Sequence, residues 1–135
     1  RPASALPRPG VARGHAIVTA RPQRTADWLA DMLEATRLAR SYVEGSDRER
    51  FFADRRTQQA VILNLLVLGE AATRVLNADP AFAASHPELP WPQMRGMRNR
   101  MAHGYFDVDL DIVWQTVNES LPALERQLVL LIETI

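Results

Sequence analysis

The segment 54–77 constrains the fold more than any other part of the chain, because it is apolar on almost every side. We interpret it as one long helix in which Asn64 and Glu70 are the polar exceptions. Such a helix has to be buried in the middle of a bundle or against a second subunit. Because a chain of 135 residues has little other surface with which to cover it, we expect a homodimer.

Two interpretations of Glu70 stay open at this point. It can pair with Arg74, which lies one turn later on the same helix. Alternatively, it can line a cleft or pair with Arg98 of another helix.

The rest of the chain also has helical periodicity. Apolar residues at steps of three and four predict a helix over 25–43, capped by Thr25 or Asp27 and followed by Gly45. Further helical segments are expected over 48–53, 81–85 and 92–102, and a last helix from Asp109 with a bend near Asn118, where Pro122 removes a backbone hydrogen bond. The apolar residues that should face the core are Trp28, Met32, Ala35, Ala39, Tyr42, Phe51 and Phe52, and then the seam Trp114, Val117, Leu121, Leu124, Leu128, Leu131 and Ile135.

No segment alternates as a strand does, so we predict an all-α bundle of four to five helices over residues 23–135. Residues 1–22 are rich in proline and glycine, lack helical periodicity and are predicted to form an irregular or disordered tail.

Composition excludes several kinds of site. The formal net charge is zero, so a basic surface for nucleic acid has to be local, and Arg95, Arg98 and Arg100 supply one. There is no cysteine, and the three histidines lack the spacing of metal ligands, so we expect no metal and no cofactor. No apolar run is judged long enough to span a membrane and no signal peptide is recognised, which favours a cytoplasmic protein without a membrane partner.

The segment 98–105 carries the chemistry. Arg98 offers a planar fork that suits phosphate, and His103 can exchange protons near neutral pH. Together they supply what the cleavage of a phosphodiester needs when no metal is present, with Asn99 as a polar neighbour.

Helical geometry limits how these two residues can act together. Arg98 falls in the same arc as Trp91, Met94, Met97 and Met101, where a charge must be paired or face a wet cleft. His103 would lie about 140° around an unbroken helix from Arg98. Either the helix ends near Ala102, with Gly104 as its stop, and His103 swings back, or a second subunit completes the site. We expect both to contribute.

The spacing Arg98-x4-His103-x-Tyr105 resembles the motif of the HepT toxins of HepT–MntA toxin–antitoxin pairs, within the HEPN superfamily. The resemblance covers about residues 24–130 and extends to the flanking segments 31–35, 54–60, 68–72, 86–91, 108–109, 113–114 and 119–122. Only the tail 1–22 has no counterpart.

This resemblance implies a metal-independent endoribonuclease that acts as a symmetric dimer, with one composite cleft between two motif helices. Carried over by position, Arg98 and His103 are the catalytic pair, assisted by Asn99, while Arg95 and Arg100 have only an electrostatic role towards RNA. Tyr105 corresponds to the tyrosine that an MntA-like nucleotidyltransferase antitoxin modifies with AMP.

Two other functions remain open. The chain could be a non-catalytic HEPN adaptor that dimerises and binds a nucleotidyltransferase, although an intact Arg98 and His103 speak against this. It could also be a plain helical interaction domain, in which Tyr105 and Phe106 only plug the end of the bundle.

Overall fold

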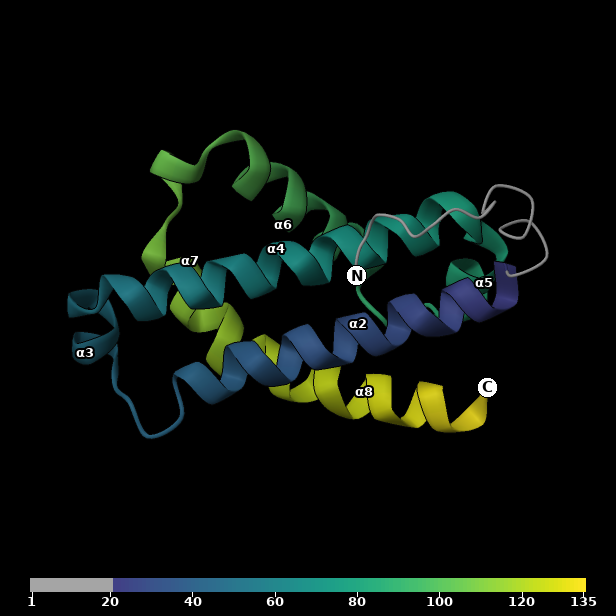
Figure 1. The fold of residues 1–135 in the computed structure, drawn as a ribbon, viewed down its shortest axis with the longest axis horizontal. Helices are drawn as coiled ribbons and strands as arrows, with labels where there is room; N and C mark the ends of the chain where they lie inside the picture. The colour runs from purple at the N-terminus through teal and green to yellow at the C-terminus, as the bar shows by residue number, and fades with distance from the viewer. Residues whose placement is uncertain (1–20) are drawn as a thin grey trace, which may run out of the picture.

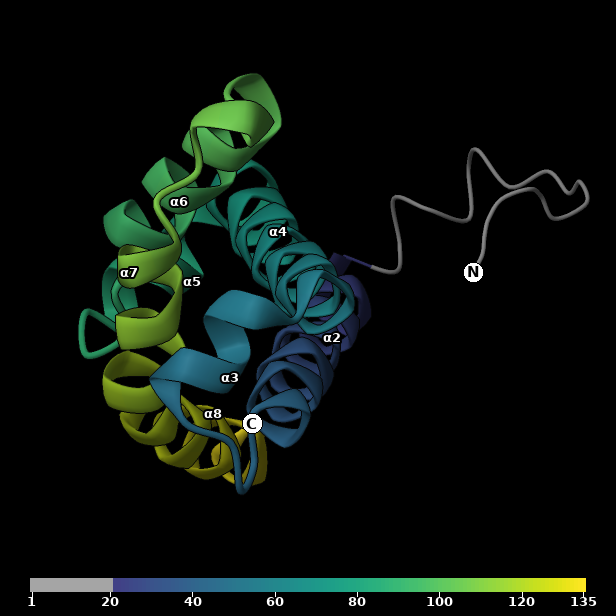
Figure 2. The same cartoon turned by 90° about the vertical axis from the view of Figure 1, so that its left-hand side faces the viewer.

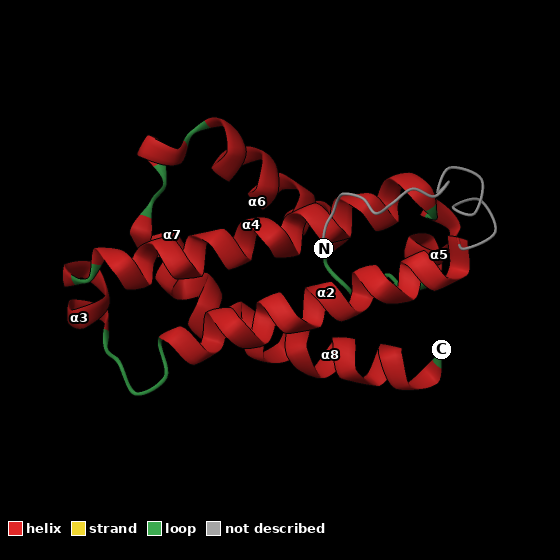
Figure 3. Ribbon diagram, viewed as in Figure 1, coloured by secondary structure: helices red, strands yellow, loops and turns green. Residues whose placement is uncertain are grey.

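The structure, a computed structural model, describes residues 21–135. The tail predicted over 1–22 therefore lies outside the described residues, except that Arg21 and Pro22 already belong to the first helix. Within the described part every element is helical and no strand is present, which confirms the all-α prediction (Figure 3).

Four longer helices form the bundle: α2 (Arg21–Tyr42), α4 (Arg55–Ala78), α6 (Trp91–His103) and α8 (Leu121–Thr134). They alternate in direction along the chain, and α4 lies between α2 and α6 while α8 packs on α2 (Figure 1). Three six-residue helices connect them: α3 (Arg48–Ala53), α5 (Pro80–Ser85) and α7 (Leu110–Gln115). Viewed from the end, the helices surround a single core (Figure 2).

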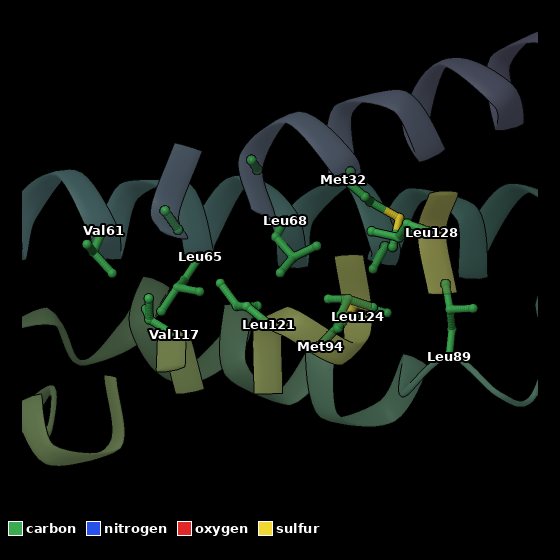
Figure 4. Packing of buried hydrophobic residues seen from close by; sticks show 14 of the residues in the cluster. Met32, Val61, Leu65, Leu68, Leu89, Met94, Val117, Leu121, Leu124 and Leu128 are labelled. Atoms are coloured by element: carbon green, nitrogen blue, oxygen red, sulfur yellow. The ribbon is translucent and has the colours of Figure 1, made fainter. Parts of the chain in front are cut away.

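That core is made mainly of aliphatic and methionine side chains from all four longer helices, together with the buried aromatic residues Phe51 and Trp91. Leu65 and Leu68 of α4, Leu121, Leu124 and Leu128 of α8, and Met32 and Met94 all belong to this one buried cluster (Figure 4). The predicted C-terminal seam is buried from Val117 to Leu131, whereas Trp114 is only partly buried and Ile135 is exposed. On α2, Met32, Ala35 and Ala39 are buried as predicted, but Tyr42 is exposed.

Aspartate side chains cap the N-termini of four helices, α3, α4, α5 and α7. Asp54 caps α4 by accepting a hydrogen bond from the Thr57 amide, and Asp109 caps α7 as predicted. The hydrogen bonds from Thr57 hold the pKa of Asp54 below its ordinary value. The predicted cap of the first helix is wrong, because α2 begins at Arg21, before Thr25 and Asp27. The Thr25 hydroxyl instead donates to Asp79, the N-cap of α5, at 3.0 Å.

Pro122 has the predicted effect on the last helical stretch. Between α7 and α8 the residues Thr116–Ser120 form a π-helical turn, labelled η2. Proline lacks the N–H that would bond back to residue 118, so the regular α pattern cannot continue through this point. This π-helical turn lies where the bend near Asn118 was predicted.

An ion-pair cluster fixes α8 against α2. Glu125 accepts hydrogen bonds from Arg37 at 3.0 Å and from Arg40 at 2.5 Å. Burial alone would raise the pKa of Glu125, but the bonds from the two arginines lower it below its ordinary value.

The helix α4 is more apolar than we expected from the sequence. By length and composition alone α4 could cross a membrane, contrary to our expectation that no segment would. In the fold, 56% of its most apolar window is buried against the other helices, as in the core helix of a bundle.

Candidate functional site

The motif helix α6 is held against α4 by an unusually close backbone contact. It begins at Trp91, whose indole N–H donates to the His86 carbonyl at 2.9 Å. A side chain at Gly69 would place its Cβ 2.6 Å from the Arg98 Cβ and 2.8 Å from the Met94 carbonyl oxygen. Only glycine fits at this position. Because Gly69 has no side chain, the Cβ of Arg98 packs directly against the backbone of α4.

This contact gives a testable prediction about stability. Gly69→Ala should destabilise the protein by about 1–3 kcal/mol, because one of the two helices must shift. Gly96→Ala is the matched control on α6, since its Cβ would meet only the flexible end of Arg100 at 3.4 Å. That variant should be neutral or slightly stabilising, as alanine is the better helix former. Chemical denaturation of both variants measures the difference, and equal stabilities would contradict the close-contact argument.

Arg98 is paired, as its position on the packed side of the helix requires. Its Nε lies 3.1 Å from Glu70 Oε1, and its side chain is 26% exposed. The Nε atom itself is buried, and the contact is an ion pair whose alignment does not make a hydrogen bond. One terminal nitrogen, Nη1, donates to Asn99 Oδ1 at 2.9 Å.

Glu70 satisfies both interpretations that the sequence left open. Its Oε2 lies 3.3 Å from Arg74 Nε on the same helix, while its Oε1 faces Arg98 of α6. The carboxylate therefore sits between two guanidinium groups, one from each helix.

His103 does not swing back towards Arg98. It is the last residue of α6, and Gly104 ends the helix after it with a φ of −138°, outside the left-handed region. Regular helical geometry therefore keeps His103 about 140° around the axis from Arg98, on the exposed side of α6. Gly104 ends the helix as predicted, but His103 is still its last helical residue, so helical geometry favours the alternative in which a second subunit completes the site.

The other polar residues of α6 divide between its two sides. Asn99 and Arg100 are exposed and share the outward side with His103. Arg95 is partly buried and donates to Asn77 Oδ1 of α4 at 3.1 Å. Asn99 is thus the residue that links the two sides, because it contacts Arg98 and faces outward.

Tyr105 and Phe106 do not plug the end of the bundle. They lie in the short 3₁₀ turn η1 (Tyr105–Asp107) that follows α6. Tyr105 is 45% exposed and Phe106 97%, and their rings meet edge to face with centroids 5.7 Å apart. Both side chains are therefore available to another molecule.

The described part of the chain has no cluster of metal-ligating side chains, and its open cavity lies away from the motif residues. Among residues 24–135 no three His, Cys, Asp or Glu side chains come together as a metal site would require. An open cavity of about 460 Å³ lies between the end of α2 and η2, around Arg37, Arg40 and Glu125. None of the motif residues lines it.

The sequence reading missed Gly69 and Asn77 as partners of the motif helix. The signal for Gly69 was a lone glycine inside an otherwise strong helical pattern, which often marks a close backbone approach. Nothing in the sequence pointed to Asn77.

Comparisons with known proteins identify the family of this chain. The family model described as "Ribonuclease HepT-like" matches residues 32–131. A Thermococcus cleftensis protein named "Probable ribonuclease HepT" is 39% identical over 99 residues, which cover 73% of this chain and 87% of that protein. A Methanocaldococcus jannaschii protein named "Putative RNase MJ1380" is 32% identical over 100 residues, covering 74% and 89% of the two chains. No solved structure shows a significant match.

Proposed function

The chain belongs to the HepT-like family of HEPN ribonucleases, and on that premise we propose that it cleaves RNA without a metal ion, using Arg98 and His103. The observation that carries this proposal is the placement of Arg98. Arg98 is a permanent cation on the packed side of α6. Its Nε forms an ion pair with Glu70, and its Nη1 donates a hydrogen bond to Asn99. Its remaining N–H groups can take a phosphate.

The reaction would run through the 2′-hydroxyl next to the scissile phosphate. His103 takes the proton of that hydroxyl, whose oxygen then attacks phosphorus. Arg98 stabilises the extra negative charge on the phosphoryl oxygens. The bond to the 5′-oxygen breaks, and this leaving group takes a proton from the imidazolium, so that the products are a 2′,3′-cyclic phosphate and a 5′-hydroxyl.

The direct test compares two substrates with the purified protein. An RNA oligonucleotide should be cut in the presence of a chelator, and the fragments should carry the cyclic phosphate. The same oligonucleotide with 2′-deoxy sugars should remain intact, because it lacks the nucleophile. Cleavage that needs an added divalent ion, or cleavage of the deoxy substrate, would refute this chemistry.

We also propose that a second copy completes the site. Arg98 and His103 of one α6 lie on different sides of the helix, so a single subunit cannot aim both at one phosphate. The structure leaves apolar surface next to Arg98 uncovered, since Leu63 and Val67 of α4 are 58% and 40% exposed. They share one stripe of α4 with Glu70 and Arg74.

A second copy is the occupant that fits this stripe. It would cover the apolar side chains and bring its own His103 to the Arg98 of the first copy. A chain that sediments as a monomer while it cleaves RNA would contradict this assembly.

The third part of the proposal concerns regulation. We propose that the chain is the toxin of a toxin–antitoxin pair and that a nucleotidyltransferase antitoxin transfers AMP to the Tyr105 hydroxyl. The exposure of Tyr105 in η1 supports this, because another enzyme can reach it. Its position two residues after His103 means that an added phosphate would compete with RNA for the cleft. The toxin, its RNA substrate and the antitoxin would then meet in the cytoplasm.

A further inference from the structure

We propose that Glu70 is a positioning residue for the reaction: it holds the Arg98 guanidinium by its Nε edge so that the terminal nitrogens face the phosphate. This inference rests on the proposed role of Arg98 and assigns a separate function to a residue of α4.

The contacts of Arg98 divide its donors into two groups. A guanidinium has five N–H groups in a fixed plane. Glu70 lies at the Nε edge at 3.1 Å, and Asn99 accepts one N–H from Nη1 at 2.9 Å. The remaining donors are the second N–H of Nη1 and both of Nη2. These form the end of the fork, which is the part suited to bidentate contact with phosphate oxygens.

The carboxylate is itself held in place from two directions. Its backbone follows Gly69, where α4 and α6 touch so closely that no side chain fits. Its second oxygen lies 3.3 Å from Arg74 Nε. The close helix contact therefore fixes where the Glu70 backbone lies beside α6, and its carboxylate gives the Arg98 guanidinium a defined partner.

Exposure argues against a purely structural role for this ion pair. The Glu70 side chain is 45% exposed and that of Arg98 is 26% exposed. An ion pair whose carboxylate is this exposed contributes little to the free energy of unfolding, because water and salt screen it. The Glu70 carboxylate is also unfavourable for binding RNA, since it places a negative charge beside the cleft.

A positioning role and a purely structural role of Glu70 therefore predict different kinetics for the Glu70→Ala variant. Without the carboxylate, Arg98 is free to rotate and is less often aligned with the phosphate, so kcat should fall by about tenfold or more. The cleft loses one negative charge at the same time, so KM for RNA should stay the same or decrease. A structural role would instead lower the melting temperature and the active fraction.

The experiment measures kcat, KM and melting temperature for the full chain and three variants. Glu70→Gln keeps the size and an oxygen beside Nε but loses the charge, so its kcat should lie between those of the wild type and Glu70→Ala. Arg74→Gln is the matched control, because it removes the other partner of Glu70 and leaves the contact to Arg98. Its kcat should fall less than that of Glu70→Ala, because the carboxylate stays beside Arg98 and only its second contact is lost.

The outcomes separate this inference from the proposed function. If Arg98→Ala is inactive but Glu70→Ala has a normal kcat, the positioning role is wrong and the ribonuclease proposal stands. A raised KM in Glu70→Ala, or a kcat loss that follows a fall in melting temperature in both Glu70 variants, would also overturn it. If Arg98→Ala itself cleaves RNA normally, the role of Arg98 fails first, and the positioning role fails with it.

Discussion

Arg98→Ala and His103→Ala should each lower the rate of RNA cleavage by at least about 100-fold, the loss expected when a proton-transfer or charge-stabilising group is removed. Both variants should fold normally. His103 is exposed at the end of α6, and removal of Arg98 leaves Glu70 paired with Arg74. Single-turnover cleavage of a defined RNA gives the rate, and circular dichroism with thermal melting checks the fold.

Arg100→Ala is the matched control for these two variants. It removes the same charge as Arg98→Ala from the same helix, but from the outward side. We expect a change of a few-fold at most, mainly in RNA affinity and dependent on salt. If Arg98→Ala behaves like Arg100→Ala, Arg98 contributes only to the electrostatic field, and its catalytic role is refuted.

Tyr105→Phe should separate toxicity from neutralisation. The variant keeps the ring, and with it the edge-to-face contact with Phe106, but loses the only atom of this side chain that can accept AMP. We therefore expect RNA cleavage to persist at least in part, while co-expressed nucleotidyltransferase no longer protects the cell. Intact-mass measurement after co-expression should show AMP-sized additions on the native chain and none on the variant.

The chain offers a close control for this experiment. Its only other tyrosine, Tyr42, is 41% exposed, against 45% for Tyr105, but lies at the end of α2. Tyr42→Phe should be modified and neutralised like the native chain. Equal protection of cells that carry Tyr105→Phe would show that the antitoxin acts by binding alone.

The bundle could be predicted because its signals are local. Apolar residues at steps of three and four set α4 and α8, and the Asp109 cap and the effect of Pro122 follow from single residues. The predicted start of α2 was wrong because of a tertiary contact. Thr25 resembles a helix cap in sequence, but in the fold its hydroxyl contacts Asp79, 54 positions later.

The candidate site was only partly predictable. The position of Arg98 on the packed side of α6 follows from helical geometry, and the sequence correctly required a partner for it. The identity of that partner depends on how closely α4 and α6 approach, which Gly69 sets. The orientation of His103 depended on a single residue at the helix end, where sequence rules are least reliable.

The central claim is that Arg98 of one copy and His103 of another act on the same phosphate. Co-expression of Arg98→Ala and His103→Ala chains with different tags allows purification of dimers that contain one of each. In a symmetric dimer, one of the two sites then keeps a native Arg98 and a native His103 from different chains. This mixed dimer should cleave RNA at about half the wild-type rate, although each parent is inactive. A mixed dimer as inactive as its parents would contradict the composite site.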